Sequence, residues 1–154
     1  ARAAEILRGS KYRGIMLAPT RASELVAAVE RFRHAKPPLL LLSPAVMTGW
    51  NFPFTDCEYQ IITKIPFPDT RSAIVRARIA TTDGYREHLT MQVLVQGCGR
   101  GMRAEDDRCE TFIIDNHATW FLRRAREMGL GASWFWDAIQ PVKAPPAPCE
   151  KLRA

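Results

Sequence analysis

Gln96–Arg103, with the sequence QGCGRGMR, places one amide and two guanidinium groups at positions i, i+4 and i+7. If the chain is helical up to about residue 100, the side chains of Gln96, Arg100 and Arg103 share one face. Two arginines and a glutamine on one face, with glycines nearby that let a polyanion approach, suit negative charge that develops on a transferring phosphate. The segment alone also fits a basic helix end whose arginines are solvated or cap carbonyls.

Short apolar segments alternate with amphipathic segments along the rest of the chain. We expect buried strands at 14–20 and 39–42, and further strands at 58–65 and 110–114. We expect helices at 23–33 after an N-cap at Ser23, at 70–80 after a cap at Thr70, at 118–129 and at 134–139. Asp115 is expected to cap the helix that follows it, although the apolar residues before it superficially resemble a metal-binding carboxylate pattern.

Residues 85–100 are ambiguous between a strand and a helix. Met91, Val93 and Val95 alternate as in a strand, whereas Leu89, Val93 and Gln96 fit one helical face. The length of the segment favours a helix.

The alternation of short buried strands and helices predicts an α/β fold. Its mostly parallel sheet is expected to be covered by helices on both faces, as a three-layer fold. The loops at the carboxyl ends of such strands form the binding edge. We expect one domain over residues 1–140 and a Pro-rich, disordered tail over residues 141–154.

Charge and composition narrow the possible partners and compartments. The net charge of +6 suggests a polyanionic partner, nucleic acid above all. No apolar stretch approaches the ~20 residues that cross a bilayer, and the N-terminus lacks an apolar secretion segment. We therefore expect no membrane partner and a cytoplasmic or nucleoid-associated protein, not a secreted one. The four cysteines contain no C-x-x-C pair and read as free thiols, with no metal bound by this chain.

Two further segments carry candidate binding residues. Leu40–Pro53 (LLLSPAVMTGWNFP) is a strand that leads into a Ser-containing loop and then Gly49, whose lack of a Cβ permits close backbone approach. Ile61–Pro68 (IITKIPFP) ends a strand with Lys64. Alternatively, the first segment is an ordinary strand-to-turn junction and Lys64 is a solvated lysine.

Together, these three segments resemble the second motor lobe of superfamily 2 DNA helicases, nearest the XPD/DinG branch. Gln96–Arg103 resembles motif VI (Q-x-x-G-R-x-x-R), Leu40–Pro53 resembles motif V, and Ile61–Pro68 resembles the I-x-K-L-P-F stretch after motif V. The likeness covers roughly residues 14–140. It implies a RecA-like α/β fold and favours a helix over residues 85–100.

The resemblance also implies roles for individual residues. Arg103, together with Arg100, is expected to act on the γ-phosphate of ATP as arginine fingers, assisted by Gln96. Contacts to the nucleotide are expected from Gly49, Asn51 and Gly99. Contacts to single-stranded nucleic acid are expected from Thr20, Thr48 and Lys64. Asn51 departs from the family pattern, which has Asp there, and an amide cannot stabilise a positive partner as a carboxylate can.

The sequence has neither G-x-x-x-x-G-K-[ST] nor a D-E-x-H box. ATP and Mg²⁺ are therefore expected to be held mainly by a first RecA-like lobe of the same protein, and the chain alone should not hydrolyse ATP. The expected partners are that first lobe and single-stranded DNA, with RNA possible. Two alternatives stay open: a non-hydrolysing RecA-like module that binds nucleic acid or a protein, and an unrelated α/β enzyme whose arginines bind a phosphorylated metabolite.

Overall fold

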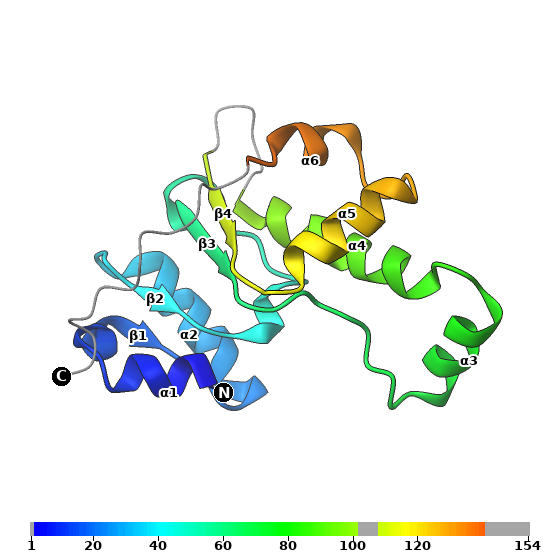
Figure 1. Ribbon diagram of the computed structural model, residues 1–154. Coiled ribbons are helices and arrows are strands. Elements are labelled where there is room, and N and C mark those ends of the chain that lie inside the picture. The colour runs from blue at the N-terminus through cyan, green and yellow to red at the C-terminus, as the bar shows by residue number, and fades with distance from the viewer. Residues whose placement is uncertain (1, 102–107, 141–154) are drawn as a thin grey trace.

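The computed structural model describes residues 2–101 and 108–140, over which helices and strands alternate (Figure 1). The helices are α1 (Arg2–Arg8), α2 (Ala22–His34), α3 (Ala73–Thr81), α4 (Tyr85–Cys98), α5 (Ala118–Glu127) and α6 (Ser133–Ala138). The strands are β1 (Met16–Leu17), β2 (Leu40–Leu41), β3 (Tyr59–Ile62) and β4 (Glu110–Ile113). Short 3₁₀ turns lie at Lys11–Ile15, Pro44–Val46, Phe54–Asp56 and Gly99–Gly101. The expected tail and Arg103 lie outside the described residues.

The strands pair in parallel, as predicted, but the described strands form two separate two-stranded sheets. β1 pairs with β2, Met16 opposite Leu40, and β3 pairs with β4, Tyr59 opposite Glu110. Strands do form within 14–20 and 39–42, as predicted, but each is two residues long and half-buried, so the predicted extent and full burial are wrong. Proline at 19, 38 and 44 explains the short pairing, because proline has no N–H to donate to a ladder.

The core lies between the inner face of β3–β4 and helices α4, α5 and α6. Alternation along β3 directs Ile62 inward, where it is 4% exposed. The buried residues packed there are Ile62, Ile65, Met91, Leu94, Ala118, Phe121, Ala125 and Phe135. Burying each large apolar side chain stabilises the fold by about 1.5–3 kcal/mol. The carboxyl ends of β3 and β4 are thereby fixed against α4 and α5.

The ambiguous segment 85–100 is helical up to Cys98, which confirms the helix prediction. Met91 and Leu94, three residues apart, are buried, whereas Val93 and Val95 are only half-buried. The packing of one helical stripe therefore decides the conformation, and the strand-like alternation is incidental.

Two predicted helix caps are wrong by one or two residues. At α2, Glu24 Oε2 accepts the N–H groups of Thr20 (2.9 Å) and Arg21 (3.3 Å), so Ser23 is inside the helix. At α3, the cap is Ser72, whose hydroxyl accepts the Val75 N–H at 3.5 Å. At α2 a glutamate in the first turn reaches back to the N–H groups before the helix, and at α3 a short polar residue lies closer to the first open N–H group.

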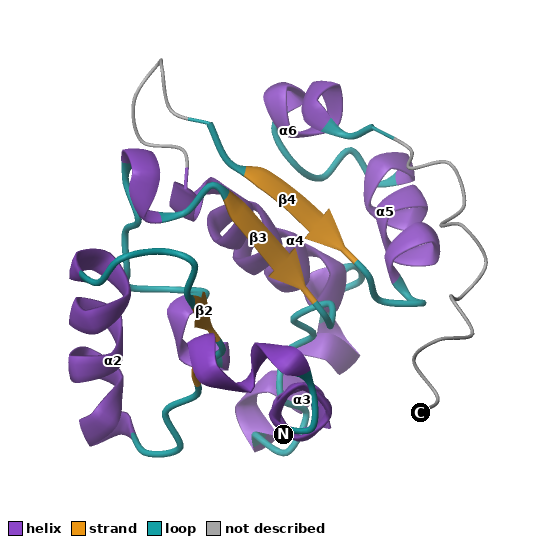
Figure 2. Cartoon of the chain, turned by 90° about the vertical axis from the view of Figure 1, so that its left-hand side faces the viewer, coloured by secondary structure: helices purple, strands orange, loops and turns teal. Residues whose placement is uncertain are grey.

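The outer face of the β3–β4 pair carries exposed apolar side chains. Figure 2 shows the two strands in front of α4, and on the open face Tyr59 is 66%, Ile61 56% and Ile114 63% exposed. Within the described part of the chain, helices cover only one face of this pair. The expectation of helices on both faces is not met there.

Asp115 fixes the carboxyl ends of both central strands. One carboxylate oxygen accepts the N–H of Ile65, after β3, at 2.6 Å, and the other accepts the N–H of His117, before α5, at 3.0 Å. These N–H groups hold the pKa of Asp115 at about 2. The predicted cap is off by two residues, because the N-cap of α5 is His117, and the carboxylate of Asp115 accepts the N–H of that residue. Asp115 thereby joins the loop after β3 to the start of α5.

Asp115→Asn should lower the free energy of unfolding at neutral pH by about 1.5–3 kcal/mol, because an amide can satisfy only one of the two N–H groups. The folded-state pKa is depressed, so this contribution is complete above the ordinary carboxyl value of about 3.9 and disappears as pH falls towards 2. Denaturant unfolding between pH 7 and pH 2 measures it.

Asp83→Asn, in the exposed turn before α4, is the matched control and should leave unfolding unchanged. Equal destabilisation by both variants would contradict the assignment to Asp115.

The 3₁₀ turn after α4 packs on the thiols that precede β3 and β4. A Cβ at residue 101 would lie 2.5 Å from Cys109 Sγ and 3.2 Å from the Cys57 carbonyl oxygen, whereas a Cβ at Gly99 would meet nothing within 4 Å. The described cysteines form no disulfide with one another, and burial raises the pKa of nearby Cys98 to about 11. Cys98 is therefore a protonated packing group at neutral pH.

Gly101→Ala should destabilise the fold by about 1–3 kcal/mol, as overpacking in a filled site does. Gly99→Ala should be close to neutral, because its φ of −79° is ordinary and the space is open. Thermal unfolding of both variants makes the comparison. Equal melting temperatures would show that the turn does not rest on Cys109.

Candidate functional site

The loop after β2 is built to turn sharply at the carboxyl end of its strand. The Ser43 hydroxyl accepts the Ala45 N–H at 3.2 Å, which starts the 3₁₀ turn Pro44–Val46. Gly49 has a φ of +80°, a conformation that side chains with a Cβ rarely adopt. The chain from Thr48 to Asn51 consequently lies exposed or half-buried beyond the end of β2.

Arg100 binds this loop from the turn after α4. Its Nε donates to the Met47 carbonyl at 3.3 Å, and its Nη1 donates to the Trp50 carbonyl at 3.1 Å. Nη1 also approaches Asn51 Oδ1 at 3.4 Å. All three acceptors are neutral oxygens, so these contacts position the guanidinium without cancelling its charge. The predicted alternative of arginines that cap carbonyls describes this residue well.

Two further contacts join the same segments. The Phe52 N–H donates to the Arg100 carbonyl at 3.1 Å. Gly97 lets the Met47 methyl group lie against α4, because a Cβ at residue 97 would be 2.5 Å from Met47 Cε. Residues 47–52 and 97–100, some 50 positions apart in sequence, therefore form one structural unit.

Helix α2 supports the loop from its other side through Arg33. The guanidinium donates to the Asn51 carbonyl, lies 3.5 Å from Asp56 Oδ2 and stacks over the Phe52 ring at 5.8 Å. Phe32 also meets Phe52 edge to face at 5.8 Å. Sequence reasoning missed Arg33, since nothing in the pattern separates it from the other basic residues at the end of α2.

The structure brings some of the predicted nucleotide-site residues together and separates others. Arg100, Asn51 and Gly49 belong to the joined unit, and Gly99 lies in the same turn as Arg100. Gln96 is exposed and lines a separate hollow of about 380 Å³ with His88, Gln92 and Leu130. The helix ends at Cys98, so the common helical face expected for Gln96 and Arg100 does not form.

The predicted nucleic-acid residues each follow the carboxyl end of a strand. Thr20 comes after β1, Thr48 after β2 and Lys64 after β3, and all three are exposed. The Thr20 hydroxyl is already engaged, since it donates to Glu24 Oε2 at 3.2 Å. Lys64 follows strand β3 and precedes Ile65, whose N–H is held by Asp115.

Within residues 2–101 and 108–140, no group of three or more His, Cys, Asp or Glu side chains could hold a metal ion. In the same ranges, no helix combines the length and apolar character that crossing a membrane requires. The candidate site is the loop after β2 joined to the turn of Arg100, whose guanidinium meets only neutral oxygens. The guanidinium of Arg33, which supports the loop, is paired with Glu30 and Asp56.

Comparison with known families agrees with this arrangement. Residues 2–128 match the model of the helicase C-terminal domain, and both joined segments fall inside the match. A comparison with curated proteins gave no match. Because the family model covers 127 of the 154 residues, from 2 to 128, the chain belongs to the helicase C-terminal domain family.

Proposed function

We propose that this chain is the second motor lobe of an ATP-dependent DNA helicase of superfamily 2, of the XPD/DinG type. Family membership supports a helicase-type module that works with nucleic acid and a partner domain. The motif-like segments Leu40–Pro53, Ile61–Pro68 and Gln96–Arg103 support the narrower assignment. The partner domain would be a first RecA-like lobe that carries the P-loop and holds ATP and Mg²⁺.

The observation that carries the proposal is the anchoring of the turn at Arg100 to the loop after β2. Arg100 is tied to the loop that holds Thr48, and Arg103 comes three residues later in sequence. A guanidinium placed on a transferring phosphate contributes about 10³–10⁵ in turnover. Arg103 would supply that charge, and Arg100 would position the turn while adding its own uncancelled charge nearby.

The described residues fit a nucleotide that is held from the opposite side. Arg100 uses Nε and Nη1 on the loop, and its Nη2 makes no hydrogen bond within the described part of the chain. Gly49 leaves backbone accessible beside it. Bound ATP supplies the phosphate that is transferred to water. This chain's residues would orient it, balance its charge and exclude solvent as the lobes close.

A non-hydrolysing binding module is the second candidate, and the surroundings of Asn51 favour it. Both oxygens of this residue face arginines, the carbonyl towards Arg33 and Oδ1 towards Arg100. An amide there holds the loop without the carboxylate that the resemblance leads one to expect. In that case the loop binds nucleic acid and takes no part in ATP hydrolysis.

In the helicase that carries both lobes, Arg103→Ala should reduce kcat by about 10³-fold or more and change ATP affinity little. The reason is that a finger stabilises charge present only in the transition state. Arg103→Lys should rescue little, since an ammonium lacks the planar fork. Gln96→Ala should be milder and should uncouple unwinding from hydrolysis. Turnover and nucleotide affinity are measured for each variant.

Arg100→Ala separates positioning from direct contact. It should lower the melting temperature of the lobe as well as turnover, because the hydrogen bonds to Met47 and Trp50 are lost.

If Arg103→Ala reduces ATP binding and turnover equally, or reduces neither, the finger assignment fails. Full turnover in Asn51→Asp but none in the natural sequence would favour the non-hydrolysing module.

Single-stranded DNA should bind this chain weakly and with strong salt dependence, because only a few cations neutralise phosphates. Lys64→Ala should reduce the slope of log K against log [salt] by about 0.7, the value for one phosphate contact on a single strand. Titration of a fluorescent oligothymidylate at several salt concentrations measures the slope.

Lys36→Ala provides the matched control, since Lys36 is an exposed lysine that precedes β2 and thus lies before a strand instead of after one. Its slope should equal that of the unchanged chain. Affinity that is independent of salt would remove nucleic acid from the partners of this surface.

A further inference from the structure

Helix α3 stands off from the body of the molecule between the loop after β3 and the start of α4 (Figure 1). Its sequence, AIVRARIAT, has six apolar residues among nine, yet none of the nine is buried. Ile74 is 70% exposed, more than any other large apolar side chain described. A helix that is apolar on most of its circumference is normally covered, so its exposure here marks an interaction surface.

The two sides of α3 differ in their surroundings. Val75 and Ile79, one turn apart, are half-buried, as expected for the side that faces the rest of the chain. At 100° per residue, the opposite side carries Ala73, Ala77 and, at the end of the helix, Thr81, with Ile74 at its margin. Small residues on that side let another helix approach closely. The exposed side is therefore a strip of small residues, apolar up to Thr81 at its end, with the one protruding side chain of Ile74.

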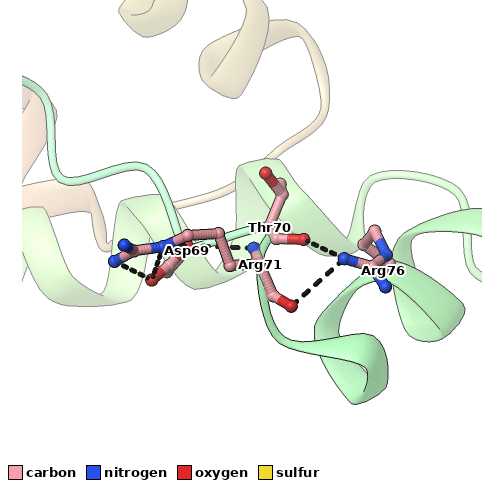
Figure 3. Close-up of polar contacts among 4 residues, drawn as sticks. All are labelled: Asp69, Thr70, Arg71 and Arg76. Atoms are coloured by element: carbon pink, nitrogen blue, oxygen red, sulfur yellow. Dashed lines mark hydrogen bonds and ion pairs between the residues drawn. The ribbon is translucent and has the colours of Figure 1, made fainter.

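Polar contacts hold the helix in place without burial. Figure 3 shows Arg71 paired with Asp69, at 2.7 Å between Nη2 and Oδ2, and Arg76 turned back to the carbonyl oxygens of Thr70 and Arg71, both at 3.1 Å. At the other end, Arg78 donates to the Tyr85 hydroxyl at 3.2 Å. A nine-residue helix is marginal in isolation, so these contacts present the strip in a preorganised form.

The charges around the strip have one sign. Ala73–Thr81 contains Arg76 and Arg78 and no acidic residue. Arg76 contacts two carbonyl oxygens, and Arg78 contacts the hydroxyl and the ring of Tyr85, so neither contact cancels the charge. The neighbouring acids are Asp69, which Arg71 neutralises, and Asp83, which lies beyond the helix in the turn. An apolar strip with a cation on each flank is complementary to apolar side chains flanked by carboxylates.

We propose that the exposed side of α3, formed by Ala73, Ile74 and Ala77 between Arg76 and Arg78, docks an acidic amphipathic helix of a protein partner. Apolar contact area favours a protein over nucleic acid, because a phosphate backbone offers nothing for Ile74 to pack against. The docking surface shares no residue with the Arg100 turn or the loop after β2. It is independent of the proposed motor function.

The test uses the full chain and two fluorescent model helices that share one leucine stripe, with glutamate on the flanks of one and lysine on the flanks of the other. Anisotropy titration should give binding of the acidic helix and at least about tenfold weaker binding of the basic helix. Two variants should each lower the affinity for the acidic helix by about tenfold or more. They are Ile74→Glu and the double variant Arg76→Glu with Arg78→Glu.

Val26→Glu is the matched control, since Val26 is an apolar residue on α2 that is 57% exposed. It should leave binding of the acidic helix unchanged. Circular dichroism should give the same melting temperature for Ile74→Glu and the unchanged chain, because an exposed side chain is altered. A large drop in melting temperature would mean that Ile74 packs internally, and the proposal would fail.

Other occupants of the surface would give distinct results. Loss of oligothymidylate binding in Ile74→Glu would assign the surface to nucleic acid. Concentration-dependent self-association that Ile74→Glu abolishes would assign it to a second copy of the chain. Equal affinity for the acidic and basic helices, or no binding of either, would also overturn the proposal. Arg103→Ala should affect none of these outcomes. The proposal for the motor function and the proposal for the docking surface can therefore be refuted separately.

Discussion

The hydrogen bonds from Arg100 to the carbonyls of Met47 and Trp50 are the contact on which the candidate site depends. They join a loop after β2 to a turn after α4, and neither segment is regular enough to hold its shape alone. The bond between the Phe52 N–H and the Arg100 carbonyl closes the same connection through the backbone. One arginine thereby converts two flexible connections into a single surface with a positive charge that neutral oxygens do not cancel.

The rest of the fold holds the two connected segments in position. The core between β3–β4 and helices α4 and α5 fixes where the turn begins, and α2 supports the loop through Arg33. Asp115 has a parallel role on the other side, because its carboxylate joins the chain after β3 to the start of α5. In each case a buried scaffold ends in polar contacts to backbone groups, and the exposed residues beyond those contacts carry the binding chemistry.

How much the sequence could predict depended on the range of the interaction involved. Local signals sufficed for the helix at 118–127, whereas the helix at 85–98 needed the length of the segment and the family resemblance to decide it. The motif-like segments identified the family that residues 2–128 match. The prolines that limit β1 and β2 were visible in the sequence, but how few residues pair between them depends on the register of the two strands, which is set by contacts distant in sequence. The separation of Gln96 from Arg100 was also hidden, since it follows from α4 ending at Cys98 where the turn meets Cys109. Arg33 gave no local signal, as its contacts with Asn51 and Asp56 are made across 18 or more residues.

The three glycines near Arg100 are not equivalent, and this difference constrains how the sequence can change during evolution. Residues 97 and 101 have partners, Met47 and Cys109, that occupy the space of a side chain, whereas residue 99 faces open space. Position 99 can therefore drift independently. Position 101 can change only together with its surroundings, because the Cβ of Cys109 and the backbone of Cys57 stand in the way. A larger residue at 97 displaces only the flexible end of Met47, and a shorter side chain at 47 would accommodate it fully. Such paired changes would preserve the joined surface in related chains even where the glycines themselves are lost.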